Sequence, residues 1–261
     1  MHLRSLANRT DLALLRLGGS EVEDRGTHLV VRTPENPSFY WGNFLLLPQA
    51  PAAGEAEEWV RRFCREFPAA RHRTFGVDGT DGSADDLAAF VDLGFETEAS
   101  VVMTARSVHE PPRPNREAVY RPLRGDEDWR LQIELSVAGE NEHVTREFAT
   151  RRAKAQRAIT EAGHGQWFGA FLGDRLVSTM GLVRAEGGLA RFQEVQTHPD
   201  ARGRGLAGTL VHHVSRFGFD ELGADTLVMV ADPDYLAIRV YRSVGFADTE
   251  TQLAASLLPK R

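Results

Sequence analysis

The chain has 261 residues, of which 42% are hydrophobic and 26% are charged, and its formal net charge is −6. This length allows one large domain or two small ones, and the composition is that of an ordinary globular protein. The negative charge argues against a nucleic-acid partner, and no apolar run is long enough to span a bilayer. The charged N-terminal stretch lacks the apolar region of a signal peptide, so we expect a cytoplasmic protein without a membrane partner.

The sequence gives little support for metal or disulfide chemistry. Cys64 is the only cysteine, which excludes an intramolecular disulfide and a cysteine-rich metal site. Its helical surroundings predict a small buried residue rather than a nucleophile. The histidines have no partners at metal-ligand spacing, so no metal is expected. Lysine occurs only at residues 154 and 260, and this preference for arginine is typical of a GC-rich bacterial genome.

The first half alternates strand and helix patterns up to about residue 105. We expect a helix within residues 1–20, strands at 28–33 and 38–47, a helix at 54–67, a strand at 71–77, a helix at 84–93 and a strand at 95–105. Three prolines follow in the polar stretch His109–Glu117, which disfavours both helix and strand pairing. The predicted division is therefore a domain at residues 1–107, a linker at 108–116 and a second domain at 117–261.

The second half has the pattern of an α/β domain with a mixed sheet and helices on both faces. Its expected elements are a strand at residues 118–122, helices at 127–137 and about 143–161, strands at 166–172, 175–183 and 190–197, a helix ending near 222, a strand at 226–230, a helix at 234–244 and a strand at 246–253. The order is β-α-α-β-β-β-α-β-α-β.

A Gly/Arg-rich turn, QTHPDARGRGLAG at residues 196–208, separates a strand from an amphipathic helix. Gly203 and Gly205 let the backbone approach a ligand without an intervening Cβ. The helix that follows offers unpaired N–H groups and the positive end of its dipole, which together suit a phosphate or pyrophosphate. The glycines also spell G-x-G-x-x-G, with Asp232 after the next strand, as in dinucleotide folds. The intervening HPDAR and the short remaining chain argue against that alternative.

Two motifs in this half resemble those of the GCN5-related N-acetyltransferase (GNAT) family. Arg202, Gly205 and Ala207 satisfy the family's acyl-CoA signature of Arg or Gln, two residues, Gly, one residue, and Gly or Ala, and Pro199 has its usual place three residues earlier. After one further strand, the family's A-x-x-x-Y-x-x-x-G-F run is reproduced by Ala237, Tyr241, Gly245 and Phe246. The resemblance covers roughly residues 118–255.

The resemblance implies a GNAT acyl-CoA N-acyltransferase fold, acetyl-CoA as co-substrate and an amine on a small molecule, peptide or protein as acceptor. It implies that the pantetheine arm takes backbone hydrogen bonds at a family bulge, and that Tyr241 protonates the departing CoA thiolate. With an ordinary pKa near 10, a tyrosine is protonated at neutral pH, as donation requires. The expected cofactor-binding residues are Val195, Gln196, Thr197, Arg202, Gly203, Arg204, Gly205, Leu206, Ala207 and Gly208.

The general base is open at the level of sequence. Many relatives use a Glu at the position that Gln193 occupies here, and Glu194 is adjacent. Strand alternation points Glu194 to the opposite face unless a bulge turns it, so Glu194, a water chain and a residue from elsewhere remain alternatives. The missing Glu also leaves a second function open, a non-catalytic acyl-CoA-binding sensor or interaction module. The retained Tyr241 favours the enzyme.

The family's acceptor pocket is bounded by the loop between the first two helices of this half, here Ser136–Arg146. Glu140, Glu142 and His143 would suit a cationic amine there, although a solvated acidic loop explains them equally well. The arginines at 146, 151, 152 and 157 are interpreted as a solvated helix face.

The first half resembles a truncated and degenerate copy of the same fold. Phe90, Gly94 and Phe95 parallel Tyr241, Gly245 and Phe246, but no cofactor signature precedes them. Such a repeat could take the place of a dimer partner, which predicts either a pseudo-dimeric monomer or a homodimer.

Overall fold

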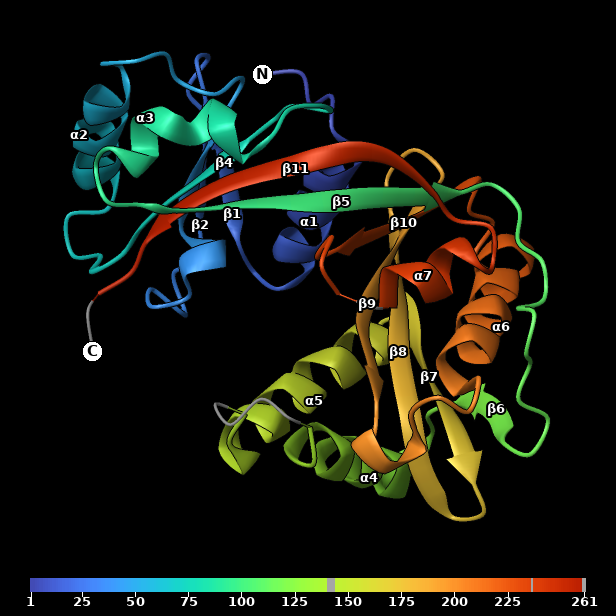
Figure 1. Cartoon of the computed structure of the whole chain (residues 1–261). Helices are drawn as coiled ribbons and strands as arrows, with labels where there is room; N and C mark the ends of the chain where they lie inside the picture. The colour runs from blue at the N-terminus through green and yellow to red at the C-terminus, as the bar shows by residue number, and fades with distance from the viewer. Residues whose placement is uncertain (140–143, 236, 260–261) are drawn as a thin grey trace. The chain divides into compact units, whose positions relative to one another are not determined.

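The computed structural model of the chain describes residues 1–139, 144–235 and 237–259 (Figure 1). The chain divides into two compact units. Unit 1 comprises Met1–Met103, Val230–Asp234 and Asp248–Arg261, and unit 2 comprises Thr104–Met229 and Tyr235–Ala247. Within the described residues, no helix has both the length and the apolar character needed to cross a membrane.

Unit 1 is built on a sheet with the strand order β1-β2-β3-β4-β11-β5. The pairs β1–β2, β2–β3 and β4–β11 are antiparallel, and β3 runs parallel to β4. Its elements are α1 (Leu6–Leu17), β1 (Glu21–Asp24), β2 (Leu29–Arg32), η1 (Tyr40–Gly42), β3 (Phe44–Leu47), α2 (Ala56–Glu66), β4 (Arg73–Val77), η2 (Ala84–Leu87), α3 (Ala88–Val91), β5 (Glu96–Ala105) and β11 (Ala247–Leu257). The sequence analysis missed β1, a short and largely exposed strand with little apolar pattern.

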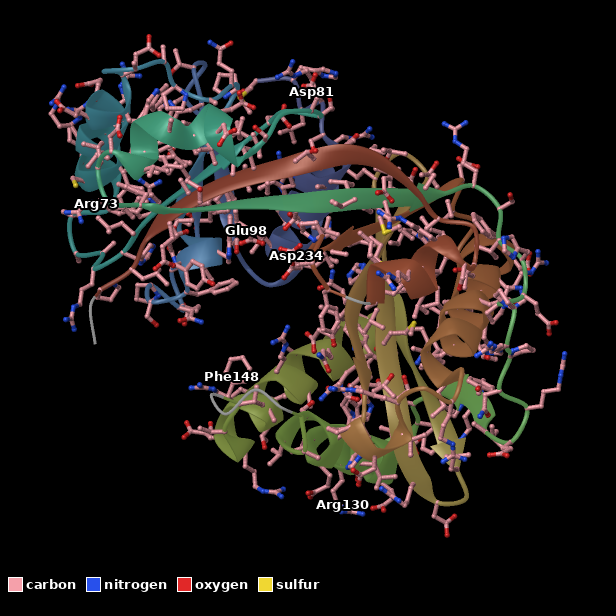
Figure 2. All side chains as sticks on the ribbon, viewed as in Figure 1. Arg73, Asp81, Glu98, Arg130, Phe148 and Asp234 are labelled. Carbon is pink, nitrogen blue, oxygen red and sulfur yellow. The ribbon has the colours of Figure 1, made fainter. Side chains whose placement is uncertain are left out.

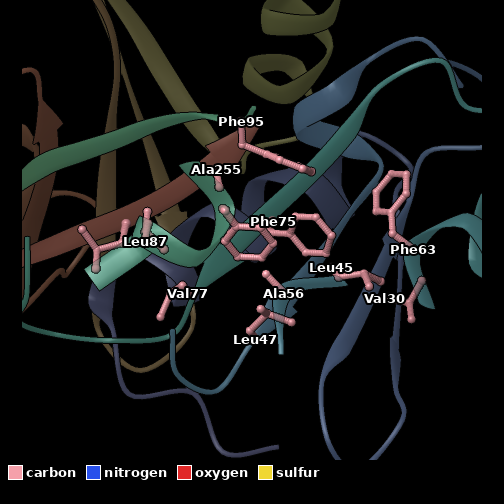
Figure 3. Close-up of a cluster of buried hydrophobic side chains, with 12 residues drawn as sticks. Val30, Leu45, Leu47, Ala56, Phe63, Phe75, Val77, Leu87, Phe95 and Ala255 are labelled. Atoms are coloured by element: carbon pink, nitrogen blue, oxygen red, sulfur yellow. The ribbon is translucent and has the colours of Figure 1, made fainter. Parts of the chain in front are cut away.

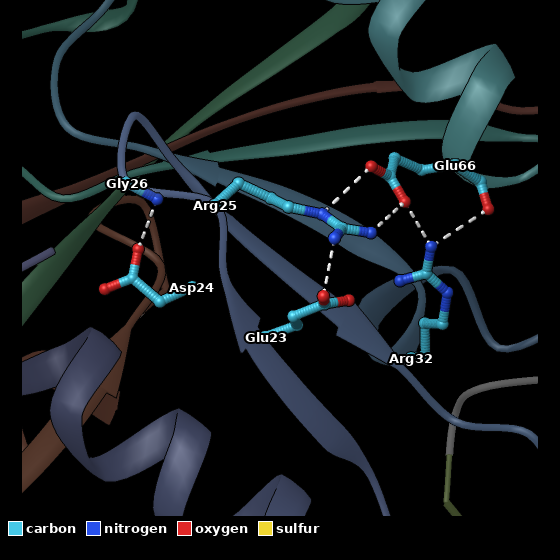
Figure 4. A network of polar contacts seen from close by, with 6 residues as sticks. All are labelled: Glu23, Asp24, Arg25, Gly26, Arg32 and Glu66. Carbon is cyan, nitrogen blue, oxygen red and sulfur yellow. Dashed lines mark hydrogen bonds and ion pairs between the residues drawn. The ribbon is translucent and has the colours of Figure 1, made fainter.

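The core of unit 1 is rich in aromatic rings (Figure 3). Phe75 of β4 stacks on Phe90 of α3 with ring centroids 4.6 Å apart, and Phe63 of α2 lies 5.6 Å from Phe75. At the edge of the same unit, Glu66 accepts hydrogen bonds from both Arg25 and Arg32 (Figure 4). The prediction that Cys64 is buried is wrong, because α2 turns its apolar side inward at Phe63 and leaves Cys64 exposed.

The last strand of the chain belongs to unit 1. β11 pairs antiparallel with β4, from Leu253 opposite Val77 to Leu257 opposite Arg73. The side chains of Leu253 and Ala255 are buried in the core of that unit. The compact units therefore differ from the division drawn from sequence, which counted this strand with the second half.

Unit 2 contains a five-stranded mixed sheet with the order β10-β9-β8-β7-β6. Its strands are antiparallel neighbours except β9 and β10, which run parallel. The elements are β6 (Val119–Pro122), α4 (Gly125–Val137), α5 (Arg146–Glu161), β7 (Gly165–Leu172), β8 (Arg175–Ala185), β9 (Leu189–Thr197), η3 (Pro199–Ala201), α6 (Leu206–Asp220), β10 (Thr226–Ala231) and α7 (Ala237–Arg242).

Helices cover this sheet on both sides, with α4 and α5 on one and α6 on the other (Figure 1). α6 packs on the sheet through an apolar face that includes Leu210 and Val214, while Phe217 meets Phe168 of β7 at 4.9 Å. The mixed α/β class is confirmed, and the elements from β6 to β11 follow the order predicted for the second half. The first turn of α6 and the second half of β9 then face the same pocket.

Candidate active site

A pocket of about 1310 Å³ lies within unit 2. Its wall is formed by four stretches: the end of β9 and the turn into α6, the Pro-rich segment before β6, the α4–α5 region, and α7. The lining residues include 111–117, 194–197 and 201–208, together with Ser136, Gly139, Val144, Phe148, Ala149 and Arg152 from the α4–α5 side and Tyr235, Ala237, Val240 and Ser243 around α7.

The second half of β9 has an open backbone edge. β10 pairs with β9 only from Thr226 opposite Leu189 to Val228 opposite Arg191. Beyond this point, residues 192–197 have no ladder partner on that side within the described chain. Their amides and carbonyls are placed where an extended ligand can pair with them as an additional strand would.

A β-bulge interrupts β9 at Glu194. Gly181 of β8 pairs with Gln193 and Thr179 pairs with Gln196, so Met180 stands opposite two residues, Glu194 and Val195. Glu194 has a φ of 52°, the only positive φ of a non-glycine residue in the described chain. The bulge reverses the alternation, so that Glu194 lines the pocket whereas Gln193 does not.

The start of α6 presents a row of unused amides. Gly203 and Gly205 adopt left-handed conformations, with φ of 73° and 75°. Thr209 donates the first helical hydrogen bond, to the carbonyl of Gly205. Among the described residues, the six amides from 203 to 208 have no protein acceptor. Together with the positive end of the helix dipole, they form a site for an anion.

The Pro-rich segment 111–117, which the sequence analysis described only as a linker, is fastened to this turn. The backbone amide of the buried Asn115 donates to Thr209 Oγ1 at 2.8 Å, and its Nδ2 donates to the carbonyl of Arg204 at 3.0 Å. A Cβ on Gly205 would lie 2.3 Å from the carbonyl oxygen of Arg113. Gly205 therefore permits the close approach of protein backbone, a role that the motif alone does not reveal.

Two arginines line the pocket near the start of α6, and one of them forms an ion pair. Arg204 donates to Glu117 at 2.6 Å, and both side chains are well exposed. Exposed ion pairs contribute little to stability and exchange easily for contacts with a ligand. Arg202 also lines the pocket.

Tyr241 lies on α7 with 6% of its surface exposed. Burial raises the pKa of its hydroxyl above the usual value, and Tyr235 raises it further, so the phenol is protonated at neutral pH. The hydroxyl makes no hydrogen bond to any residue that the structure describes. Tyr241 does not itself line the pocket, whereas its neighbours on α7, Ala237 and Val240, do.

The α5 side of the pocket carries an ion pair. Glu194 accepts hydrogen bonds from Arg152 Nε and from Gln156 Nε2, each at 2.5 Å. The guanidinium of Arg152 lies 5.6 Å from the ring centroid of Phe148, which is exposed at the pocket (Figure 2). Arg152 is therefore part of the pocket wall, which corrects its interpretation as a solvated helix face. Glu140, Glu142 and His143, proposed from sequence for the acceptor side, lie outside the described residues.

All ten residues expected to bind the cofactor line this pocket, as does Glu194. The sequence analysis missed the segment 111–117, Phe148 and the pocket-facing part of α7. These residues belong to no recognised sequence motif, because the packing of distant segments brings them to the pocket. Within the described residues, no group of three His, Cys, Asp or Glu side chains is placed to hold a metal ion.

The sequence model of the acetyltransferase (GNAT) family matches residues 131–246, which contain most of the pocket. Residues 131–246 form a GNAT domain. None of the curated protein sequences is significantly similar to the chain. The fold of the GNAT domain is that of acetyltransferases and supports acyl transfer as its general chemistry.

Several solved structures share the fold. A conserved protein of unknown function from Staphylococcus epidermidis ATCC 12228 has a TM-score of 0.72 at 10% identity, over 91% of this chain and 93% of that one. A GCN5-related N-acetyltransferase from Kribbella flavida has a TM-score of 0.65 at 14% identity, over 97% and 95%. A tandem GNAT protein from the clavulanic acid biosynthesis pathway has a TM-score of 0.56 at 13% identity, over 93% and 84%.

Proposed function

We propose that the GNAT domain is an N-acetyltransferase that moves the acetyl group of acetyl-CoA to a primary amine. One observation carries the proposal: a single pocket combines the open edge of β9, the bulge at Glu194 and six consecutive unused amides at the start of α6. A long donor with an extended arm, a thioester and a pyrophosphate has a part that suits each of these three features.

In this proposal the pyrophosphate of CoA binds the amides of residues 203–208, and Arg202 and Arg204 add charge-assisted contacts. Arg204 is free to do so once it leaves Glu117. The pantetheine arm runs along residues 195–197 and takes backbone hydrogen bonds from them. A bulge amide polarises the thioester carbonyl as negative charge develops on its oxygen.

The chemical step is direct attack. The acceptor enters as an ammonium ion and loses a proton to a base, and the neutral nitrogen then attacks the thioester carbon. The new C–N bond forms as the C–S bond breaks. The thiolate takes a proton from Tyr241, and the second proton that the nitrogen loses on becoming an amide restores the phenol. The products are a neutral amide and free CoA, and the proton on the base is released to water.

Glu194 is the base in this proposal. Glu194 lines the pocket at the bulge, where its carboxylate pairs with the half-exposed side chain of Arg152. When Glu194 accepts the proton of the ammonium ion, both groups become neutral and Arg152 keeps its positive charge. The side chain of Arg152 is half exposed, so water can solvate that charge. The buried Gln156 holds the other carboxylate oxygen in place.

Replacing Tyr241 with Phe tests the proposal. The variant should lower kcat by about 100-fold, since removing a general acid typically costs two to four orders of magnitude. The dissociation constant of acetyl-CoA should stay within about threefold, because Tyr241 is not among the residues that line the pocket. Free CoA release with a broad amine panel measures the first quantity and calorimetry the second, with Tyr40→Phe in unit 1 as the matched control.

An unchanged kcat would remove Tyr241 from the mechanism. Tight acetyl-CoA binding without CoA release from any amine would instead favour the alternative function, a non-catalytic acyl-CoA sensor. The alternative is motivated by Gln193, which occupies the position where many relatives have a Glu.

A further inference from the structure

The acceptor end of the pocket carries two opposite charges side by side. Glu194 and Arg152 both line the pocket and pair with each other, and their side chains are 24% and 49% exposed. An ion pair this accessible contributes little to stability, because water screens the attraction between the two charges. A ligand with two complementary charges can therefore replace it at little cost.

Arg152 binds Glu194 through Nε alone. Among the described residues, its two terminal nitrogens, Nη1 and Nη2, have no acceptor. These two nitrogens form the planar fork that binds a carboxylate with two parallel hydrogen bonds. The ring of Phe148 beside the guanidinium restricts where the fork lies.

The other arginines of α5 form ion pairs with residues other than Glu194. Arg146 makes two hydrogen bonds to Glu134, at 2.8 and 2.9 Å, and Arg157 pairs with Asp126 and Glu161. Arg151 pairs with Glu147 one turn earlier. Of these four arginines, all within the described chain, only Arg152 lines the pocket.

Glu194 is held in this place at a cost. Its φ of 52° lies in the left-handed region, which is strained for a glutamate, and residues in such conformations are frequent at functional sites. The conformation points the carboxylate into the pocket rather than across the sheet. The strained conformation therefore places a carboxylate in the pocket next to Arg152.

We propose that the acceptor is a free α-amino acid, whose ammonium group pairs with Glu194 and whose carboxylate binds Nη1 and Nη2 of Arg152. Both charged groups of an amino acid are bonded to one carbon atom, so they fit a pair of residues that touch each other. The inference rests on the proposed acetyltransferase function and narrows its acceptor: amines without a nearby carboxylate, including lysine side chains, leave Arg152 unmatched.

The proposal is tested with matched acceptors in the full-length protein. A panel of amino acids is compared with their amides and with their decarboxylated amines, and CoA release from acetyl-CoA gives kcat/KM for each. The amine of the amide is less basic than that of the amino acid, and the decarboxylated amine is more basic, so a difference in basicity alone cannot make the amino acid the best of the three. We expect kcat/KM for the amino acid to exceed both analogues by about tenfold or more, the effect of one charge-assisted pair.

Variants of Arg152 separate recognition from structure. In Arg152→Met the preference for the carboxylate should fall to about one, and in Arg152→Lys, which keeps the charge but loses the fork, it should be intermediate. Arg151→Met, on the adjacent residue outside the pocket, should keep the wild-type preference. Calorimetry in the presence of CoA should show amino-acid binding weakened about tenfold by Arg152→Met and not by Arg151→Met.

Analogues that match or exceed their amino acids in the wild type would overturn the proposal, as would a preference that survives in Arg152→Met. Either result is compatible with the proposed acetyltransferase function, because CoA release is still observed. The absence of CoA release with every amine would refute the acetyltransferase function and this inference with it.

Discussion

Gly203 and Gly205 share a backbone conformation but differ in their surroundings. Both lie in the left-handed region, so a side chain at either position is strained by about 1–2 kcal/mol. Around a Cβ at Gly203 there is open space, whereas a Cβ at Gly205 would meet the carbonyl oxygen of Arg113 at 2.3 Å. The signature glycine at 205 is thus required by contact with the segment 111–117 as well as by its own φ.

This difference predicts unequal effects of one substitution. Gly205→Ala should lower the free energy of unfolding by about 1–3 kcal/mol more than Gly203→Ala, since only the former must displace backbone. Urea denaturation of the two variants and the wild type measures the difference. Equal losses would show that the approach of Arg113 to Gly205 has no energetic consequence.

At the scale of elements, an ion pair between the half-exposed Arg121 and the buried Asp128 joins β6 to the first turn of α4. Arg121 donates to both carboxylate oxygens of Asp128, whose side chain also accepts the amide of Arg124 at 2.7 Å. The hydrogen bonds from Arg121 are the main cause that holds the pKa of Asp128 below its ordinary value. The negative charge also lies at the favourable end of the helix dipole.

Asp128→Asn should lower the free energy of unfolding by about 1.5–3 kcal/mol at pH 7, the worth of hydrogen bonds to a charged group. A lowered folded-state pKa means that this contribution is present above the unfolded value, near 3.8, and is lost as the pH falls through the folded one. The gap between wild type and variant in urea denaturation should therefore narrow from pH 7 to pH 3. Asp126→Asn, at a 93% exposed side chain in the same turn, is the control and should change stability by less than about 0.5 kcal/mol. A gap that widens in acid would contradict this assignment.

For the whole molecule, the decisive feature is that β11 completes the sheet of unit 1. Leu253, Ala254 and Ala255 are all at most 5% exposed, and the strand lies beside β4. The chain therefore returns to its first unit after the GNAT domain has been completed. The interpretation of the N-terminal half as a degenerate acetyltransferase-like repeat, acting as a built-in dimer partner, stays a prediction.

The fragment 117–261 should consequently aggregate or fold incompletely when it is produced alone, because β11 loses its β4 partner and leaves an apolar unpaired strand. Production together with residues 1–116 should restore solubility. Size-exclusion chromatography of both samples provides the measurement, and the same method on the full chain distinguishes a monomer from a homodimer. A fragment that is soluble, monomeric and fully active would refute the built-in partner.

The sequence by itself determined the mixed α/β class, the order of elements in the second half and the position of the glycine-rich turn before α6, while the binding of a cofactor by the ten residues stays a prediction. These features are local: apolar periodicity defines each helix and strand, and the glycine and arginine spacing belongs to one continuous turn. The same locality explains the error at Cys64, because helical periodicity does not by itself say which side of α2 meets the core.

Only the tertiary structure decided the rest. Strand alternation left the direction of Glu194 open, and it took the bulge against β8 to turn this residue into the pocket. The contact of Asn115 with Arg204 and Thr209 joins residues about 90 positions apart, and the pairing of β11 with β4 joins residues separated by even more of the chain. Such contacts depend on how distant segments pack, a property that no short sequence pattern records.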